Sequence, residues 1–207
     1  MEVVIAAFDV DNTLTVRDCV VPFMRRTIGT WGMAKASLES PVTLLRLFAQ
    51  RDRDAIKAHF VRKVFTGKSV EVIEHDGVAF ASDISEKWIR ADVAQRMRWH
   101  QDQGHVVVLV SASLEPYLSA FGDMCEVDAV LCTRLEVEDD RYTGQIVGAN
   151  CRGEEKLRRL HEWMLSAGLE NSTLAFAYGD SSGDAAMLAA ATTGVLVTRT
   201  EVLEASA

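Results

Sequence analysis

The sequence has little of what would mark a secreted or membrane-spanning protein. Its four cysteines form no C-x-x-C pair, which argues against a redox motif or a zinc ribbon. No apolar run reaches the ~18 residues that a membrane-spanning helix needs, because arginine or aspartate interrupts each candidate. The apolar run at residues 3–8 is not preceded by a basic region or a cleavage site. We therefore expect a cytoplasmic protein with no stable membrane insertion.

Positive charge is also scarce. The chain has 22 lysines and arginines against 30 aspartates and glutamates, which gives a formal net charge of -8. Nucleic acids and anionic lipids are polyanions, so this balance without an evident basic stripe disfavours them as partners. The 207 residues, of which 48% are hydrophobic and 25% charged, suit a globular protein with one core and a smaller inserted module.

Apolar runs that alternate with helical segments indicate the fold class. Strands are predicted at residues 3–8, 106–110, 129–133, 173–178 and 194–197. Helices are predicted between them, at residues 93–103, 114–121, 154–167 and 185–190. Strands that are apolar throughout are buried on both faces, and this alternation is typical of a parallel sheet covered on both sides. We expect an α/β protein with a three-layer, Rossmann-like core.

The stretch from about residue 16 to residue 89 breaks this alternation, because it contains no convincing strand. Apolar residues instead recur there at helical spacing, at Val42, Leu45, Phe48, Ile56, Phe60 and Val64. We predict a helical cap at residues 16–90, inserted into a core made of residues 1–15 and 91–207. Its apolar positions are interpreted as helix core, with a lipid groove as the alternative. Residues 135–148 alternate around a polar turn and predict a β-hairpin.

Polar side chains follow the ends of three predicted strands. Asp9 and Asp11 follow the first, Ser111 the second, and Asp180 and Asp184 the strand at 173–178. Ligands of open parallel sheets bind beyond the carboxyl ends of the strands, so these side chains should share one crevice. Four carboxylates there would repel one another unless a cation lay among them, and oxygen ligands without histidine or cysteine favour Mg²⁺. Such a metal would attract a phosphoryl group, to which Lys156 and Ser111 would add a charge and a hydroxyl donor.

In this order the residues resemble the four motifs of the haloacid dehalogenase superfamily. The D-x-D-x-T motif is at residues 9–13, the serine at Ser111, the lysine at Lys156, and the last motif at Gly179-Asp180 with Asp184. A helical insert between the first two motifs is similar to subfamily IB, the phosphoserine-phosphatase-like hydrolases. The stretch N-C-R-G-E-E-K at residues 150–156 also resembles that branch.

The resemblance implies a magnesium-dependent phosphomonoesterase that acts on a small phosphorylated metabolite. Asp9 would be the nucleophile that forms an aspartyl-phosphate, and Asp11 the general acid and base. Asp9, the backbone carbonyl of Asp11, and Asp180 would bind Mg²⁺, with Asp184 supporting its water shell. The residues implied around the phosphate are Thr13, Ser111, Ala112 and Lys156.

The sequence does not fix the substrate. Asp18 stands where phosphoserine phosphatases have glutamate, and Gly183 where they usually have asparagine. Asp18 either faces the substrate or is solvated on a loop. Phosphoserine, histidinol phosphate and a phosphatidylglycerophosphate-like lipid remain candidate substrates, and the protein is expected to be a monomer or a homodimer. A phosphotransferase or mutase with the same intermediate, and a catalytically silent module that binds phosphorylated ligands, are the alternative functions.

Overall fold

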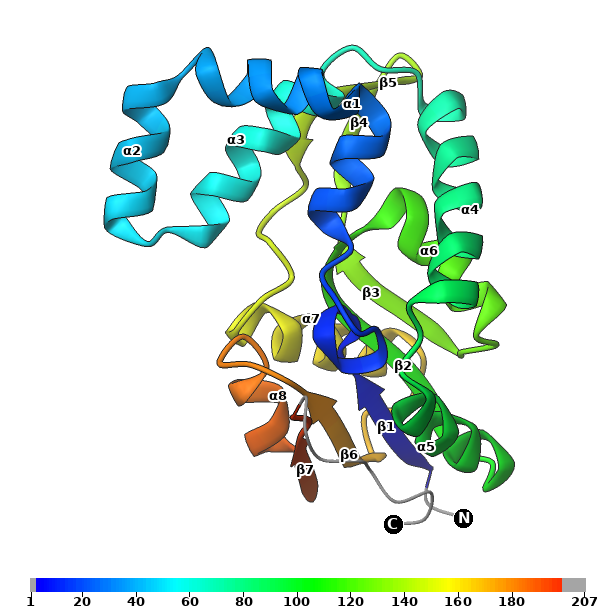
Figure 1. The fold of residues 1–207 in the computed structure, drawn as a ribbon. Helices are drawn as coiled ribbons and strands as arrows, with labels where there is room; N and C mark the ends of the chain where they lie inside the picture. Colours follow the sequence, from blue (N-terminus) through cyan, green and yellow to red (C-terminus); the bar gives the residue numbers. More distant parts are fainter. Residues whose placement is uncertain (1–2, 199–207) are drawn as a thin grey trace.

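The computed structural model describes residues 3–198. Its centre is a five-stranded parallel sheet in the order β3-β2-β1-β6-β7 (Figure 1). The strands are β1 (Val4–Phe8), β2 (Val106–Leu114), β3 (Ala129–Thr133), β6 (Thr173–Gly179) and β7 (Thr193–Leu196). At the carboxyl end of β1, Phe8 is paired with Leu109 on one side and Tyr178 on the other. The ends of β1, β2 and β6 therefore lie side by side, and the predicted α/β fold is confirmed.

Alternate residues of β1 face opposite layers. Ala6 and Phe8 pack in one core cluster with α5 (Ala91–Asp102) and α6 (Glu115–Met124). Ile5 and Ala7 pack in a second cluster with α7 (Glu154–Ser166) and α8 (Ala185–Ala190). Because both faces of the sheet are covered, the central strand β1 is an uninterrupted apolar run instead of alternating with polar residues.

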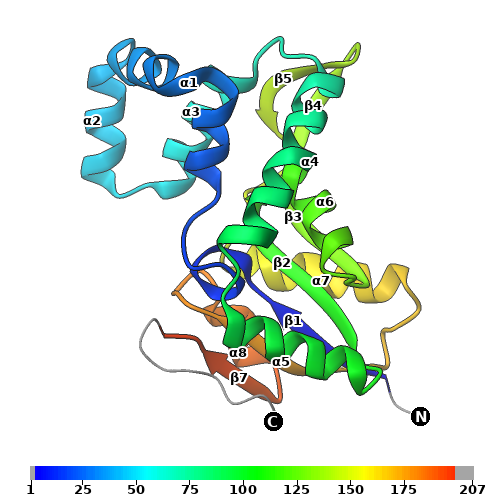
Figure 2. The ribbon, with the colours of Figure 1, turned by 45° about the vertical axis from the view of Figure 1, so that its right-hand side comes forward.

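The first four α-helices after β1, which precede α5 and β2 in the chain, lie beyond the carboxyl ends of the strands (Figures 1 and 2). They are α1 (Val20–Leu38), α2 (Pro41–Gln50), α3 (Arg53–Phe65) and α4 (Val70–Lys87). Helix α1 is bent at Gly29, whose φ of 72° interrupts the helical backbone. None of the helices in the described part of the chain is both long and apolar enough to cross a membrane.

The predicted hairpin forms from β4 (Leu135–Glu138) and β5 (Arg141–Ile146), and it is joined to the loop after α3. The amide of Gly67 donates to the carbonyl of Tyr142 at 2.8 Å, and the amide of Tyr142 donates to the carbonyl of Lys68 at 3.0 Å. At Gly144 a Cβ atom would lie 2.1 Å from Thr66 Oγ1, so this close approach requires glycine. The hairpin and the inserted helices therefore form one roof over the sheet.

The interpretation of Val42, Leu45 and Phe48 as helix core is wrong, because all three side chains are exposed. Only Leu44 of α2 is buried. Helix α2 lies at the outer edge of the roof, where its packing neighbours are α3 and the end of α1. The face of α2 that points away from these two helices is left uncovered.

Candidate active site

Asp9 and Asp11 reach the same crevice because the chain turns sharply after β1. The amide of Asp9 still bonds to the carbonyl of Tyr178 at 2.9 Å, and the next residues form the short helical turn η1 (Val10–Leu14). Asn12 adopts a left-handed conformation with φ of 63°, which asparagine tolerates better than most residues. A cavity of about 180 Å³ at this point is lined by Asp9, Asp11 and Asn12 together with Ala112, Lys156, Asp180 and Asp184.

Lys156, in the first turn of α7, lies between two buried carboxylates. Its Nζ is 2.5 Å from Asp9 Oδ1 and 2.6 Å from Asp184 Oδ1, and its side chain is 2% exposed. Burial alone would lower the pKa of the Lys156 ammonium, but the two carboxylates outweigh burial and raise it. The lysine is therefore a fixed positive charge beside Asp9.

Three carboxylates converge on this one ammonium. Oxygens of Asp9, Asp180 and Asp184 lie within 4.8 Å of one another. Burial raises the pKa of the Asp9 carboxyl to about 7, Lys156 offsets part of this rise, and Asp184 and Asp11 add repulsion. An all-oxygen donor set with more negative than positive charge fits a hard divalent cation such as Mg²⁺. Asp184, which was predicted to support the metal's water shell, therefore belongs to the same side-chain cluster as Asp9 and Asp180.

Asp11 is held by two hydrogen-bond donors. Its Oδ1 accepts from the amide of Cys19 at 2.8 Å, and its Oδ2 accepts from Ser113 Oγ at 2.7 Å. The hydroxyl of Tyr117 donates to Ser113 Oγ at 2.6 Å. Burial, followed by the charge of Asp18, raises the pKa of the Asp11 carboxyl. A carboxyl group with a raised pKa and a fixed direction is suited to proton transfer.

The residues predicted around the phosphate divide into two groups. Ala112 and Lys156 line the cavity. Thr13 donates to Asp9 Oδ2 at 3.1 Å, so its hydroxyl fixes the orientation of that carboxylate. Ser111 is fully buried, and its Oγ accepts from the amide of Ser113 at 3.0 Å, which orders the end of β2.

Four further basic or polar residues of the site were not predicted as site residues: Arg53, Lys57, Asn150 and Arg152. Arg53 and Arg152 line the cavity. Lys57 of α3 reaches down to the core, where its Nζ contacts the carbonyl of Ala112 and lies 2.6 Å from Asn150 Oδ1. Burial lowers the pKa of Lys57 to about 8. A lysine within a helical segment looks like a solvated residue, so only the position of α3 reveals this contact.

A second cavity, of about 410 Å³, opens from the crevice into the roof. Its polar end has Asp11, Arg53 and Lys57. The rest of its wall is mainly apolar, with Met24, Met33, Phe48, Ile56 and Phe60 among its residues. This cavity shares Asp11, Arg53 and Ala112 with the crevice, so the two adjoin.

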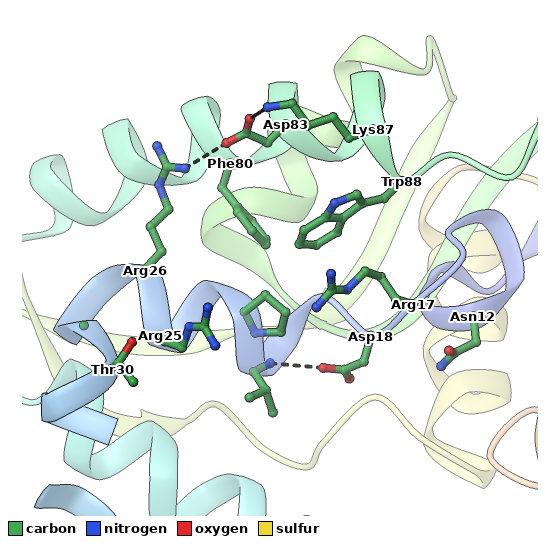
Figure 3. Close-up of a pocket in the computed structure, with 13 residues that line it drawn as sticks. Asn12, Arg17, Asp18, Arg25, Arg26, Thr30, Phe80, Asp83, Lys87 and Trp88 are labelled. Atoms are coloured by element: carbon green, nitrogen blue, oxygen red, sulfur yellow. Dashed lines mark hydrogen bonds and ion pairs between the residues drawn. The ribbon is translucent and has the colours of Figure 1, made fainter. Parts of the chain in front are cut away.

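A third and larger cavity, of about 860 Å³, lies on the Asn12 side of the crevice (Figure 3). Its wall carries more basic than acidic side chains. Arg17 lies over the Trp88 ring at 4.5 Å, and Arg26 pairs with Asp83 at 2.9 Å. Asp18 borders all three cavities, and its Oδ1 accepts from the amide of Val21 at 3.1 Å. Asp18 thus caps the start of α1 and also borders the crevice. That it faces the substrate remains a prediction.

Comparison with known proteins decides the family. The model of the haloacid dehalogenase-like hydrolases matches residues 6–189. The chain belongs to this family. Protein CicA of Caulobacter vibrioides is 35% identical to this hydrolase over 192 residues, which span 92% of this chain and 84% of CicA.

Two solved structures show the same fold as this haloacid dehalogenase-like hydrolase. A Bordetella pertussis protein of unknown function has a TM-score of 0.76 at 22% identity, over 92% of this chain and 87% of its own. A phosphoserine phosphatase solved as an analogue of its phospho-aspartyl intermediate has a TM-score of 0.60 at 19% identity, over 92% of this chain and 83% of its own. The family match confirms the predicted superfamily, and these structures show that the chain shares the fold of a phosphoserine phosphatase.

Proposed function

We propose that this hydrolase is a magnesium-dependent phosphomonoesterase that uses Asp9 as a covalent nucleophile. The observation that supports this most directly is the arrangement of Asp9 between Lys156 and Thr13, beside Asp11, Asp180 and Asp184. The substrate would be a small phosphate ester that enters the crevice below the roof. We place the enzyme in the cytoplasm, with no nucleic-acid partner.

The first step is attack by an Asp9 carboxylate oxygen on phosphorus. One Asp9 oxygen is held by Lys156 at 2.5 Å and the other by the Thr13 hydroxyl at 3.1 Å, so the carboxylate cannot rotate freely. Because the nucleophile is already oriented, less entropy is lost when the transition state forms. The new bond joins Asp9 to phosphorus, and the bond from phosphorus to the ester oxygen breaks.

Asp11 would carry the proton in both halves of the reaction. Its raised pKa favours the protonated carboxyl, which donates its proton to the leaving ester oxygen. The resulting carboxylate then takes a proton from the water that attacks the aspartyl-phosphate. The water oxygen bonds to phosphorus as the bond from phosphorus to the Asp9 oxygen breaks, which releases inorganic phosphate and returns both aspartates to their starting states.

The carboxylates of Asp9, Asp180 and Asp184 fit a bound Mg²⁺, and the backbone carbonyl of Asp11 is a further predicted ligand. The bound cation would supply positive charge that offsets the repulsion between these carboxylates and an incoming phosphate. Lys156 adds a positive charge that directly contacts Asp9. Ala112, at the end of β2, borders the same cavity and is positioned to contact a phosphate oxygen.

The roof completes the site. We propose that residues 16–90 act as a cap over a core of residues 1–15 and 91–207, and that the β4–β5 hairpin works with the cap. Lys57 bridges the two parts, because α3 carries it and its ammonium contacts Asn150 and Thr133 of the core. A closed cap limits the access of bulk water to phosphorus during attack.

Hydrolysis of p-nitrophenyl phosphate with and without Mg²⁺ tests the proposal. We expect activity that EDTA abolishes and that added Mg²⁺ restores. The variant Asp9→Asn should lose at least about 10⁴-fold in kcat, because an amide is a poor nucleophile. Asp11→Asn should lose about 10²–10⁴-fold and accumulate phosphoenzyme.

The control is Asp123→Asn, which changes an exposed carboxyl on α6 and should leave kcat unchanged. Circular dichroism spectra that match the wild type would show that the variants fold. Full activity of Asp9→Asn would contradict the nucleophile assignment. Transfer of phosphate to an added alcohol in preference to water would indicate a phosphotransferase instead.

A further inference from the structure

The outer corner of the roof carries a group of large apolar side chains that the described chain leaves uncovered. We call it the cap apolar face, and it comes from the second half of α1 and from α2 (Figures 1 and 2). Its members and their exposed fractions are Trp31 at 89%, Leu38 at 76%, Val42 at 79%, Leu45 at 72% and Phe48 at 59%.

The spacing of these residues follows the two helices. Trp31 and Leu38 are seven residues apart, which puts them on one side of α1, opposite the buried Ala36. Val42, Leu45 and Phe48 follow one another at three-residue steps along α2. Single exposed apolar residues are common on protein surfaces, but clusters of this kind mark interaction surfaces.

The segment that carries this face has a positive formal charge, although the chain as a whole has a net charge of -8. Residues 31–52 contain three basic side chains, Lys35, Arg46 and Arg51, and two acidic ones. The acidic ones are occupied locally, because Glu39 pairs with Lys63 at 2.9 Å and lies 3.8 Å from Lys35, and Asp52 accepts from the amide of Ala55. Arg53, the next basic residue, lies at the inner end of the cavity described below. The net charge alone predicted repulsion from anionic lipid, but the distribution of charge gives this corner the opposite sign.

The cap apolar face continues into the active-site region. Phe48 belongs to the face and also lines the mainly apolar cavity of about 410 Å³. At its inner end this cavity reaches Asp11 and Arg53, and Arg53 also lines the crevice that contains Asp9. An apolar tail could therefore run from the surface at Phe48 to a phosphate at Asp9.

We propose that the cap apolar face docks on an anionic lipid bilayer, and that the enzyme takes as substrate a lipid phosphate monoester from that bilayer. Tryptophan, leucine and phenylalanine flanked by arginine and lysine are typical of helices that lie in the membrane interface without spanning it. The docking rests on the exposed face and its charge. The substrate class rests in addition on the phosphomonoesterase function proposed above.

Flotation with vesicles tests the docking. Wild-type protein is mixed with vesicles of phosphatidylcholine alone or of phosphatidylcholine with phosphatidylglycerol, and bound protein is measured after centrifugation. We expect binding to the anionic vesicles that added salt weakens. The double variant Trp31→Ser/Leu45→Ser, which changes no residue of the cavity or the crevice, should bind at least about tenfold more weakly, because two large apolar side chains no longer leave water.

The matched control is Val72→Ser/Leu165→Ser, which removes two exposed apolar side chains from α4 and α7. It should bind vesicles as the wild type does. Wild-type protein that does not float, or a Trp31→Ser/Leu45→Ser variant that floats as well as the control, overturns the docking. A wild-type dimer that this variant converts to a monomer, with no vesicle binding, would make the face a subunit interface and would also overturn it.

Two substrates separate the docking from the proposed chemistry. On p-nitrophenyl phosphate the wild type and Trp31→Ser/Leu45→Ser should have equal kcat/KM. On an acylglycerol phosphate embedded in anionic vesicles, the variant should lose about tenfold or more in rate. A wild type that hydrolyses only the aryl phosphate refutes the lipid substrate and leaves the phosphatase function intact. Vesicle binding without hydrolysis of either substrate refutes the phosphatase function instead and supports the docking.

Discussion

Removal of the ammonium from the active-site crevice should destabilise the protein in a way that depends on pH. In Lys156→Met the side chain keeps a similar length and loses its charge. The lysine contacts Asp9 at 2.5 Å and Asp184 at 2.6 Å, and all three side chains are at most 7% exposed. Breaking a buried ion pair by removing one partner costs about 3–5 kcal/mol, because the other charge stays buried without compensation. We expect a loss of that size in the free energy of unfolding at pH 8 without divalent cations.

The sign of the pH dependence follows from the Asp9 carboxyl. Its pKa in the folded protein is already about 7, above the value of 3.8 for a free side chain, and it should rise further without Lys156. The folded state then binds more protons than the unfolded state as the pH falls through the raised pKa, so acidification favours folding. The difference between Lys156→Met and the wild type should therefore be smaller at pH 5.5 than at pH 8.

Urea unfolding followed by tryptophan fluorescence measures both quantities. The control Lys35→Met changes a side chain that is 78% exposed and lies 3.8 Å from Glu39, and such surface pairs are worth about 0–1 kcal/mol. If Lys156→Met is as stable as the wild type at pH 8, or if its deficit is the same at both pH values, then the buried charges do not interact as described.

Three further outcomes are expected. Burial lowers the pKa of the fully buried His100 to about 4, so the unfolded state binds more protons than the folded state below pH 6.5. The free energy of unfolding should therefore fall by up to about 3 kcal/mol between pH 6.5 and pH 4. In a series of urea-unfolding curves over this pH range, His100→Gln should show a smaller fall. Gly77→Ala should destabilise the protein by about 1–3 kcal/mol in thermal melts, although alanine favours helices, because its Cβ would lie 1.9 Å from the carbonyl oxygen of Pro116. Lys57→Met should lower kcat/KM on p-nitrophenyl phosphate by about tenfold, because it leaves Asn150 and the carbonyl of Ala112 without a charged donor. An unchanged kcat/KM would show that the contact of Lys57 with the core is dispensable for activity.

The convergence of the acidic residues was predictable because it depends on the sheet alone. Asp9 and Asp180 come directly after strands that are apolar throughout, and parallel neighbouring strands must end at the same edge. The sheet order β2-β1-β6 then brings the ends of the three strands together without any information on the cap. Their roles in catalysis remain predictions that the variants above test.

Other parts of the site depend on long-range packing that local patterns do not encode. Strand β2 was predicted to end at residue 110 but extends to Leu114, so Ser113 lies within the strand and reaches Asp11. Lys57 meets the core because α3 packs against β5 of the hairpin, an arrangement that the local sequence of α3 does not encode. The apolar spacing of α2 predicted a helix, but it did not show that only one side of that helix would find a partner.

Two chain segments, paired with each other, connect the inserted helices to the sheet. The chain leaves the sheet at Thr15 and returns at Ile89, and these two residues form an antiparallel bridge. The amide of Val16 donates to the carbonyl of Trp88 at 2.8 Å, and the amide of Arg90 donates to the carbonyl of Leu14 at 2.9 Å. The hairpin is also hydrogen-bonded to the loop after α3, so the inserted helices are connected to the rest of the protein at more than one place. Any movement that uncovers Asp9 must therefore bend the chain at residues 14–16 and 88–90 and also shift the hairpin, so residues far apart in the sequence would have to move together.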